Sequence, residues 1–195
     1  MRVKEGNKEA DIFEAAIQVF AEQGYHKAKI WEIAERAGVA TGSVYVYFEN
    51  KEDLLNKIFE KLWKQLLSKL NEIKNTSSFD PLHKMNLIVE NIFAVFAENP
   101  SLAIVFVNEH NTVTLAEDHK FKTYYDNYLD IGDEIIRNGV ESGYFSDSVD
   151  LKVFRPFIFG AVRTALHEWA QNPEEFPIMH ICDQVKLLLI NGIAK

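Results

Sequence analysis

Cysteine, proline and long apolar runs are scarce in this 195-residue chain. Cys182 is the single cysteine, so a disulfide within one chain is excluded and we expect a reducing, cytoplasmic setting. The N-terminus lacks the apolar segment of a signal peptide. No run of about 18 apolar residues occurs, which excludes a membrane-spanning segment and predicts no membrane partner.

The chain also has no surplus of positive charge, because its formal net charge is -8. That balance argues against a protein that coats nucleic acid without regard to sequence. The acidity is uneven: residues 1–64 hold 10 Lys and Arg against 11 Asp and Glu, whereas residues 65–195 hold 11 against 18. The N-terminal third, at net -1, therefore keeps basic side chains that can gather on one face.

Alternation with period two, which would indicate strands, is missing as well. Apolar residues instead recur at three- and four-residue spacing, which predicts an all-α fold of about nine helices. Gly24 and Gly38 indicate helix ends, and Asn50 and Asp80 indicate helix starts. The expected helices are 8–23, 30–37, 41–47, 51–74, 81–98, 100–111, 115–142, 151–171 and 178–193.

The strongest pattern lies in residues 24–55, where two short helices flank Gly38-Val39-Ala40. This spacing is typical of a helix-turn-helix, whose second helix enters the DNA major groove. Val44 and Phe48 are four residues apart and are expected to face inward. The opposite side is expected to be exposed and carries small or hydroxyl-bearing residues: Thr41, Gly42, Ser43, Tyr45 and Tyr47.

Several ordered motifs in this region resemble the DNA-binding domain of the TetR family. They are Gly24-Tyr25, Ile33-Ala34-Glu35-Arg36-Ala37-Gly38-Val39, Gly42-Ser43-Val44-Tyr45 and Asn50-Lys51-Glu52-Asp53-Leu54. The resemblance implies a three-helix helix-turn-helix domain in residues 1–50 and a helical ligand-binding and dimerisation domain in residues 51–195. It also implies a double-stranded DNA operator as partner.

Individual roles on DNA follow from this resemblance by position. Thr41, Gly42, Ser43 and Val46 match positions that approach base edges. Tyr45 and Tyr47 match phosphate-contacting positions, and Lys51 at a helix start is expected to face a phosphate too. Lys29 stands where the family often has Ser or Thr, and we expect it to supply a direct charge instead.

The C-terminal region is rich in aromatic residues, and its chemistry fits either a plain hydrophobic core or an apolar pocket between helices. A few polar residues interrupt the apolar helices and favour the pocket. The predicted ligand-binding residues are Phe93, Phe96, Phe106, His110, Tyr124, Tyr128, Phe159 and Arg163.

Within the TetR family, the chain is similar to the fatty-acid-metabolism regulators of FadR type, through Gly24-Tyr25-His26, Leu102-Ala103-Ile104-Val105 and Ile158-Phe159-Gly160. This likeness implies a long-chain acyl-CoA as effector. The segment after Val105 is basic in those relatives but reads Asn108-Glu109-His110-Asn111 here. A CoA phosphate would therefore need a base elsewhere, which can be Arg155, Arg163, Lys120, Lys122 or a further basic residue.

Other readings stay open. The effector can be a bare fatty acid, or the chain can be a multidrug-type regulator that senses diverse hydrophobic compounds. A helical enzyme or a module that ignores DNA is a third reading, but the six histidines show no HExxH or Cys/His metal spacing. We therefore predict no catalytic residues, no metal and no cofactor.

The last two expected helices are apolar over broad surfaces, so two copies of the pair would form a four-helix bundle. A symmetric homodimer is also what reads a palindrome with half-sites about 34 Å apart. Together these features predict a repressor that an apolar effector releases from a palindromic operator. The helix over residues 51–74 is the expected link, because Lys51 at its start meets the DNA-binding domain.

Overall fold

The computed structural model describes residues 7–114, 120–175 and 177–193, and this part of the chain folds into nine helices without strands. The all-α prediction is confirmed, with helix ends shifted by at most a few residues. The start predicted at Leu115 lies outside the described residues. The helices are α1 (Lys8–Gln23), α2 (Ile30–Arg36), α3 (Thr41–Tyr47), α4 (Lys51–Asn75), α5 (Pro81–Ala97), α6 (Pro100–Thr114), α7 (Lys120–Glu141), α8 (Leu151–Gln171) and α9 (Ile178–Ile193).

Local signals set the short helices α1 to α3. Gly24 follows α1 with φ +78°, a left-handed value that side chains rarely adopt. At the start of α4, the Asn50 side chain accepts a hydrogen bond from the Asp53 N–H at 2.8 Å, and Asp53 accepts one from the Glu49 N–H at 3.0 Å. Val44 and Phe48 are buried in the hydrophobic core, so one side of α3 packs on this core while its other side faces solvent.

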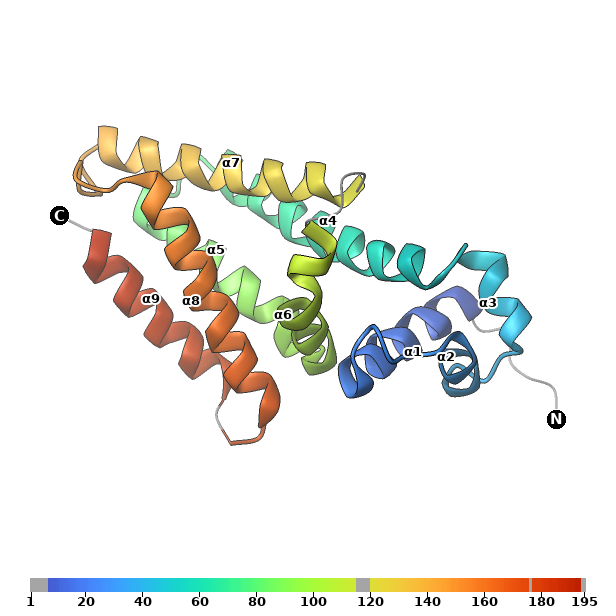
Figure 1. Cartoon of the computed structure of the whole chain (residues 1–195). Coiled ribbons are helices and arrows are strands. Elements are labelled where there is room, and N and C mark those ends of the chain that lie inside the picture. The colour runs from blue at the N-terminus through green and yellow to red at the C-terminus, as the bar shows by residue number, and fades with distance from the viewer. Residues whose placement is uncertain (1–6, 115–119, 176, 194–195) are drawn as a thin grey trace.

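Helix α4 connects the two ends of the molecule. Figure 1 shows it running from the unit formed by α1 to α3 into the larger helical part, where it packs along α7. Its buried side continues one hydrophobic core from Leu54 and Ile58 to Leu70 and Ile73. Helix α6 packs against both α1 and α8, while α8 and α9 lie on the outer side of the larger part.

Among the described residues, no single helix is long and apolar enough to cross a membrane; α5 with residues Pro100–His110 passes that test only as a pair bent by 109°.

Candidate functional site

The outer side of α3 and its surroundings form the first candidate site. Val46 is 77% exposed and Tyr45 is 54% exposed, and Thr41 and Gly42 are also at the surface. Tyr47 was expected to be exposed, but it is partly buried and packs against the hydrophobic core. The surface offered by α3 is therefore centred on Tyr45 and Val46.

Lys51 requires a correction. Its ammonium donates hydrogen bonds to three backbone carbonyls of the turn between α1 and α2: Tyr25 O at 2.7 Å, His26 O at 3.2 Å and Ala28 O at 3.0 Å. It also lies 4.6 Å from the centre of the Tyr25 ring. An ammonium has three protons, so none is left for a phosphate. Lys51 thus fixes the turn, while the neighbouring Lys29 is exposed.

Replacing Lys51 with methionine tests this assignment. The Lys51→Met protein should unfold more easily by about 1–3 kcal/mol, because three carbonyls, two of them partly buried, lose their donor. The salt dependence of its DNA binding should keep the wild-type slope. The matched variant Lys29→Met should retain wild-type stability and lower the slope by about one. Urea unfolding and binding titrations at several salt concentrations measure both. If Lys51→Met instead kept the wild-type stability and lowered the salt slope, Lys51 would be the phosphate contact.

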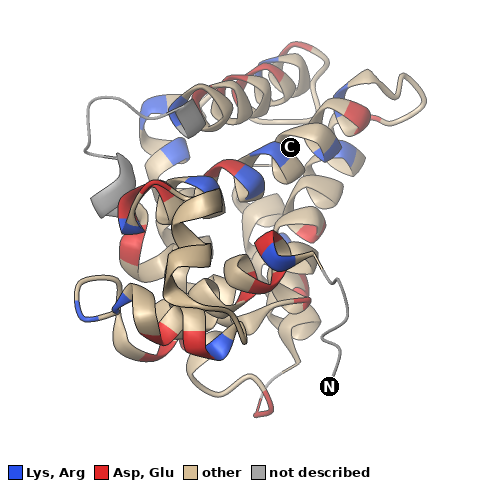
Figure 2. Cartoon of the chain, turned by 90° about the vertical axis from the view of Figure 1, so that its right-hand side faces the viewer, with Lys and Arg blue, Asp and Glu red and all other residues tan. Residues whose placement is uncertain are grey.

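Sequence reasoning missed two residues near α3. Trp31 on α2 is 56% exposed. The sequence could have indicated this exposure, because Ile30 and Ile33 define the inward face of the helix and leave Trp31 on the other side. Lys57 on α4 donates to the carbonyl of Tyr47 at 3.0 Å and so fixes the end of α3. Figure 2 faces this end of the molecule, where basic and acidic residues are interspersed rather than separated into one basic surface.

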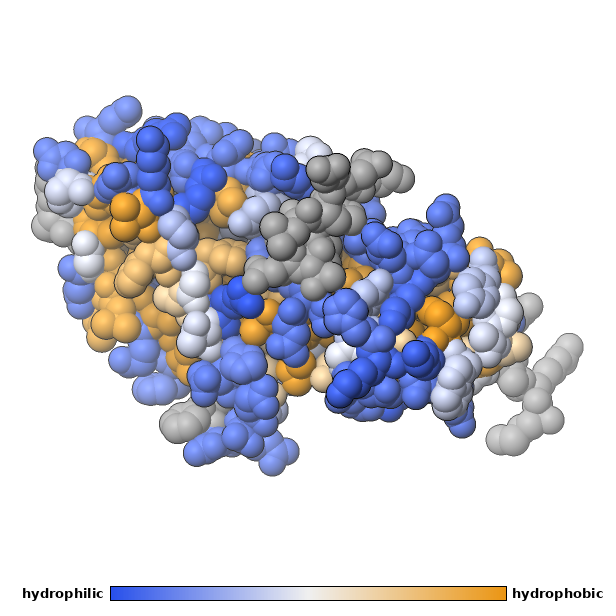
Figure 3. Space-filling model, viewed as in Figure 1, coloured by the Kyte–Doolittle hydropathy of each residue, from blue (hydrophilic) through white to orange (hydrophobic). Residues whose placement is uncertain are grey.

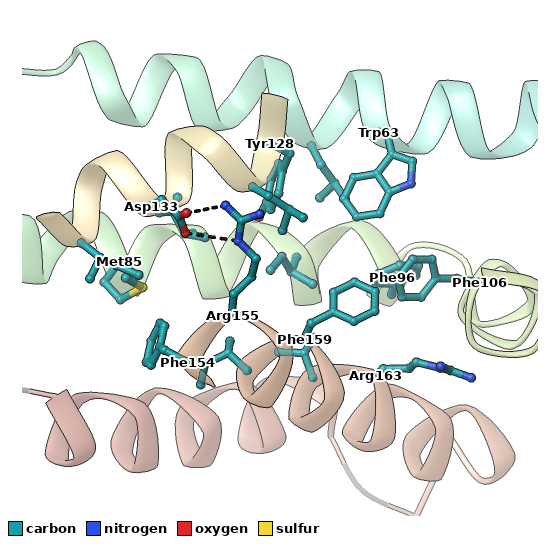
Figure 4. A pocket seen from close by; sticks show the side chains of 18 residues that line it. Trp63, Met85, Phe96, Phe106, Tyr128, Asp133, Phe154, Arg155, Phe159 and Arg163 are labelled. Atoms are coloured by element: carbon teal, nitrogen blue, oxygen red, sulfur yellow. Dashed lines mark hydrogen bonds and ion pairs between the residues drawn. The ribbon is translucent and has the colours of Figure 1, made fainter. Parts of the chain in front are cut away.

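The second candidate site is an apolar cavity of about 120 Å³ that is lined by side chains of α4 to α8 and is partly open to solvent. Figure 4 shows the 18 side chains that line it, with Trp63 from α4, Phe106 from α6 and Phe159 from α8 gathered toward one end. Five of the predicted ligand-binding residues lie on its wall: Phe96, Phe106, Tyr128, Phe159 and Arg163.

The other three predicted residues lie outside the wall. Phe93 is fully buried in the core. Tyr124 lies under the ammonium of Lys64, 5.0 Å from its ring centre. His110 packs behind the wall, with ring centres 5.4 Å from Phe106 and 4.8 Å from Phe159. Helical periodicity alone does not show which face of α5, α6 or α7 borders the cavity.

One ion pair interrupts the apolar wall. The guanidinium of Arg155 on α8 pairs with the Asp133 carboxylate on α7 (Figure 4). A carboxylate oxygen of Asp130 lies 3.5 Å from the same guanidinium. These carboxylates hold the pKa of Arg155 above its usual value, mainly through the hydrogen bond that Arg155 donates to Asp133. The pair is neutral as a unit, so an uncharged chain can lie beside it without meeting an unbalanced charge.

Helix α6 connects this cavity to the turn between α1 and α2. The buried Glu109 accepts a hydrogen bond from the Tyr25 N–H at 3.2 Å, one helical turn beyond Phe106 on the cavity wall. Burial, and secondarily the charge of Arg163, lower the pKa of the neighbouring His110 to about 4, so it is neutral at pH 7. The turn at Tyr25 is thus held from two sides, by α4 through Lys51 and by α6 through Glu109.

Known proteins match both parts of the chain. A family model described as bacterial regulatory proteins of the tetR family matches residues 12–58, and one described as the C-terminal region of YsiA-like proteins matches residues 59–192. The fatty acid metabolism regulator protein of Bacillus subtilis is 33% identical over 187 residues, which is 95% of each chain.

Solved structures agree along almost the whole length. The fatty acid degradation regulator FadR from Bacillus halodurans is 33% identical, with a TM-score of 0.82 and 97% of each chain covered. FadR from Bacillus subtilis in complex with stearoyl-CoA is 30% identical, with a TM-score of 0.77, over 94% of this chain and 98% of that one. The relatives with these names are regulators rather than enzymes, in agreement with the sequence prediction.

Proposed function

Since the chain belongs to the TetR family and is therefore a DNA-binding transcriptional regulator, we propose that it is a repressor whose effector is a long-chain acyl-CoA. The observation that carries this proposal is the apolar cavity between α4 and α8. Its wall of aliphatic and aromatic side chains suits a hydrocarbon chain, and the similar FadR from Bacillus subtilis has been solved with stearoyl-CoA.

The size of the cavity supports a coupling between effector and DNA. Ligand pockets typically enclose about 300–1,000 Å³, whereas this one encloses about 120 Å³. We therefore propose that the surrounding helices move apart when a long acyl chain enters. The filled and unfilled proteins then differ in shape, and an effector acts on DNA binding through its different affinity for the two shapes.

The route of that movement follows from the contacts around Tyr25. Trp63 on α4 and Phe106 on α6 both line the cavity. The same two helices hold the turn at Tyr25, through Lys51 and Glu109 respectively. Separation of α4 and α6 would pull this turn and reorient α1 to α3. The sequence predicted α4 as the link, and we now propose α6 as its counterpart.

We further propose that α8 and α9 form a homodimer interface, which places two copies of α3 on a palindromic operator in the cytoplasm. The α8–α9 face, defined by Val153, Phe157, Ala161, Val185 and Leu188, borders an open groove of about 640 Å³. Figure 3 shows hydrophobic side chains gathered over these helices. A second copy is the favoured occupant because a helix-turn-helix reads two half-sites through a symmetric pair. Residues 1–50 and 51–195 remain the proposed domains.

The test is release of DNA by the effector. An operator is first selected from random duplexes, and binding is followed by fluorescence anisotropy while palmitoyl-CoA is added. A coupling of about 1–3 kcal/mol predicts that the dissociation constant rises roughly 5- to 150-fold. A hydrophobic cationic dye should have no such effect. Failure to select any duplex, or release by the dye alone, would contradict the proposal.

The exposed side of α3 gives a separate prediction. Tyr45→Ala should weaken operator binding about tenfold, which corresponds to about 1.4 kcal/mol, with unchanged thermal stability because the ring is largely in solvent. The matched control is Tyr144→Ala, which removes an exposed tyrosine from the other part of the molecule. Equal operator affinity in the two variants would remove Tyr45 from the interface.

A further inference from the structure

An open polar cleft lies beside the apolar cavity, between α6 and α8. It encloses about 420 Å³ and is lined by Val107, Asn108, Gly160, Arg163, Thr164 and His167. Arg163 lines both the cleft and the cavity. In Figure 4 it stands at the Phe106 end of the cavity, with its guanidinium directed away from the apolar side chains. The two spaces therefore meet at this one residue.

The charge of Arg163 is not balanced by a carboxylate within the described part of the chain. None of the ion pairs found there includes it, although its side chain is partly buried. Arg155, about two helical turns away on α8, is in contrast paired with Asp133 and Asp130. A guanidinium stays charged at any physiological pH and offers five N–H donors, so Arg163 is a preformed anion-binding group.

The rest of the cleft fits an anion as well. Asn108 has an amide and Thr164 a hydroxyl that can donate, and His167 adds an imidazole. No Asp or Glu is among the residues that line this cleft. The cleft extends well beyond the Arg163 guanidinium and offers room for a head group much larger than a carboxylate.

We propose that this cleft binds the phosphate-bearing head group of a CoA thioester, while the acyl chain passes Arg163 into the apolar cavity. This inference rests on the proposed effector function and assigns its polar half. Among the bases that the sequence offered for a CoA phosphate, Arg163 lines both the cavity and the cleft. Arg155 is occupied by carboxylates, Lys122 is exposed away from both lining sets, and the side chain of Lys120 lies outside the described residues.

The experiment compares a ligand that has the phosphates with one that lacks them. Palmitoyl-CoA and palmitate are titrated into the full-length protein, with Trp63 on the cavity wall contributing to the fluorescence signal. Arg163→Gln should weaken palmitoyl-CoA binding about tenfold or more, equivalent to about 1.4 kcal/mol. Palmitate binding should change by less than about threefold, which is about 0.65 kcal/mol.

Two further variants make the comparison decisive. Asn108→Asp places a carboxylate in the cleft at an exposed position, where folding is not at risk, and should also weaken palmitoyl-CoA selectively. Arg137→Gln removes an exposed guanidinium that lines neither space and should leave both affinities unchanged.

The outcomes separate this inference from the function on which it rests. If the two cleft variants bind palmitoyl-CoA as well as the wild type does, or lose both ligands equally, the phosphate site is refuted while the effector cavity stands. If the wild type binds neither ligand, the acyl-CoA effector is refuted and the phosphate site with it.

Discussion

Leu188→Glu is expected to yield a monomeric protein that no longer binds its operator at concentrations at which the wild-type protein saturates this DNA. Leu188 on α9 is 74% exposed, and Phe157 on α8, which borders the same groove, is 69% exposed. When two copies meet through these helices, a carboxylate at position 188 would be buried among apolar side chains. An unpaired charge in such surroundings costs several kcal/mol, enough to prevent association.

The loss on DNA should be large because one copy of α3 reaches only one half-site. Joining two half-site contacts in one molecule gains about a hundredfold to ten-thousandfold in affinity, and the monomer forfeits that gain. Sedimentation velocity gives the oligomeric state and anisotropy gives the operator affinity. Ser68→Glu adds the same charge on the exposed side of α4 and should remain a dimer. A dimeric Leu188→Glu protein with normal operator binding would place the interface elsewhere.

Gly132→Leu is expected to give a repressor that binds its operator but no longer responds to acyl-CoA. Gly132 lies on the cavity wall, and a Cβ built there has no heavy atom within 4 Å. A leucine side chain can therefore occupy much of the 120 Å³ that the acyl chain must enter. Removal of a glycine from the interior of α7 should also stabilise the fold, by about 0.5–1 kcal/mol.

The expected signature is thus higher thermal stability together with at least a hundredfold loss of effector affinity. Thermal unfolding and palmitoyl-CoA titration measure the two effects on the same sample. Gly132→Ala is the matched control, since it gains the helix preference but fills little of the cavity. If Gly132→Leu still releases DNA at wild-type effector concentrations, the acyl chain must bind outside this cavity.

The sequence was sufficient for features that depend on near neighbours. The cap at Asn50 joins residues three apart, and the inward faces of Val44 and Phe48 follow from helical spacing. The exposure of Tyr45 and Val46 then follows, because the opposite face of α3 is already used. The family resemblance added the expected roles on DNA, which the described geometry leaves as predictions.

Contacts between distant segments could not be predicted in this way. Glu109 and Tyr25 are 84 residues apart, and the carbonyls that receive Lys51 precede it by 23 to 26 residues. A lysine at a helix start looks the same in a sequence whether it meets a phosphate or a carbonyl. The Asp133–Arg155 pair is similar, since only the fold brings α7 and α8 near enough for these two side chains to meet.

The turn at Tyr25 is held through its backbone, since Lys51 contacts its carbonyls and Glu109 its N–H. A movement of α4 or α6 therefore shifts this turn in the same way, whichever ligand causes the movement. Substitutions around Trp63, Phe106 and Phe159 can consequently retune the chemical preference of the sensor without altering the base sequence that the protein reads. The same operator can thus come under the control of a different metabolite through substitutions confined to the distant helices.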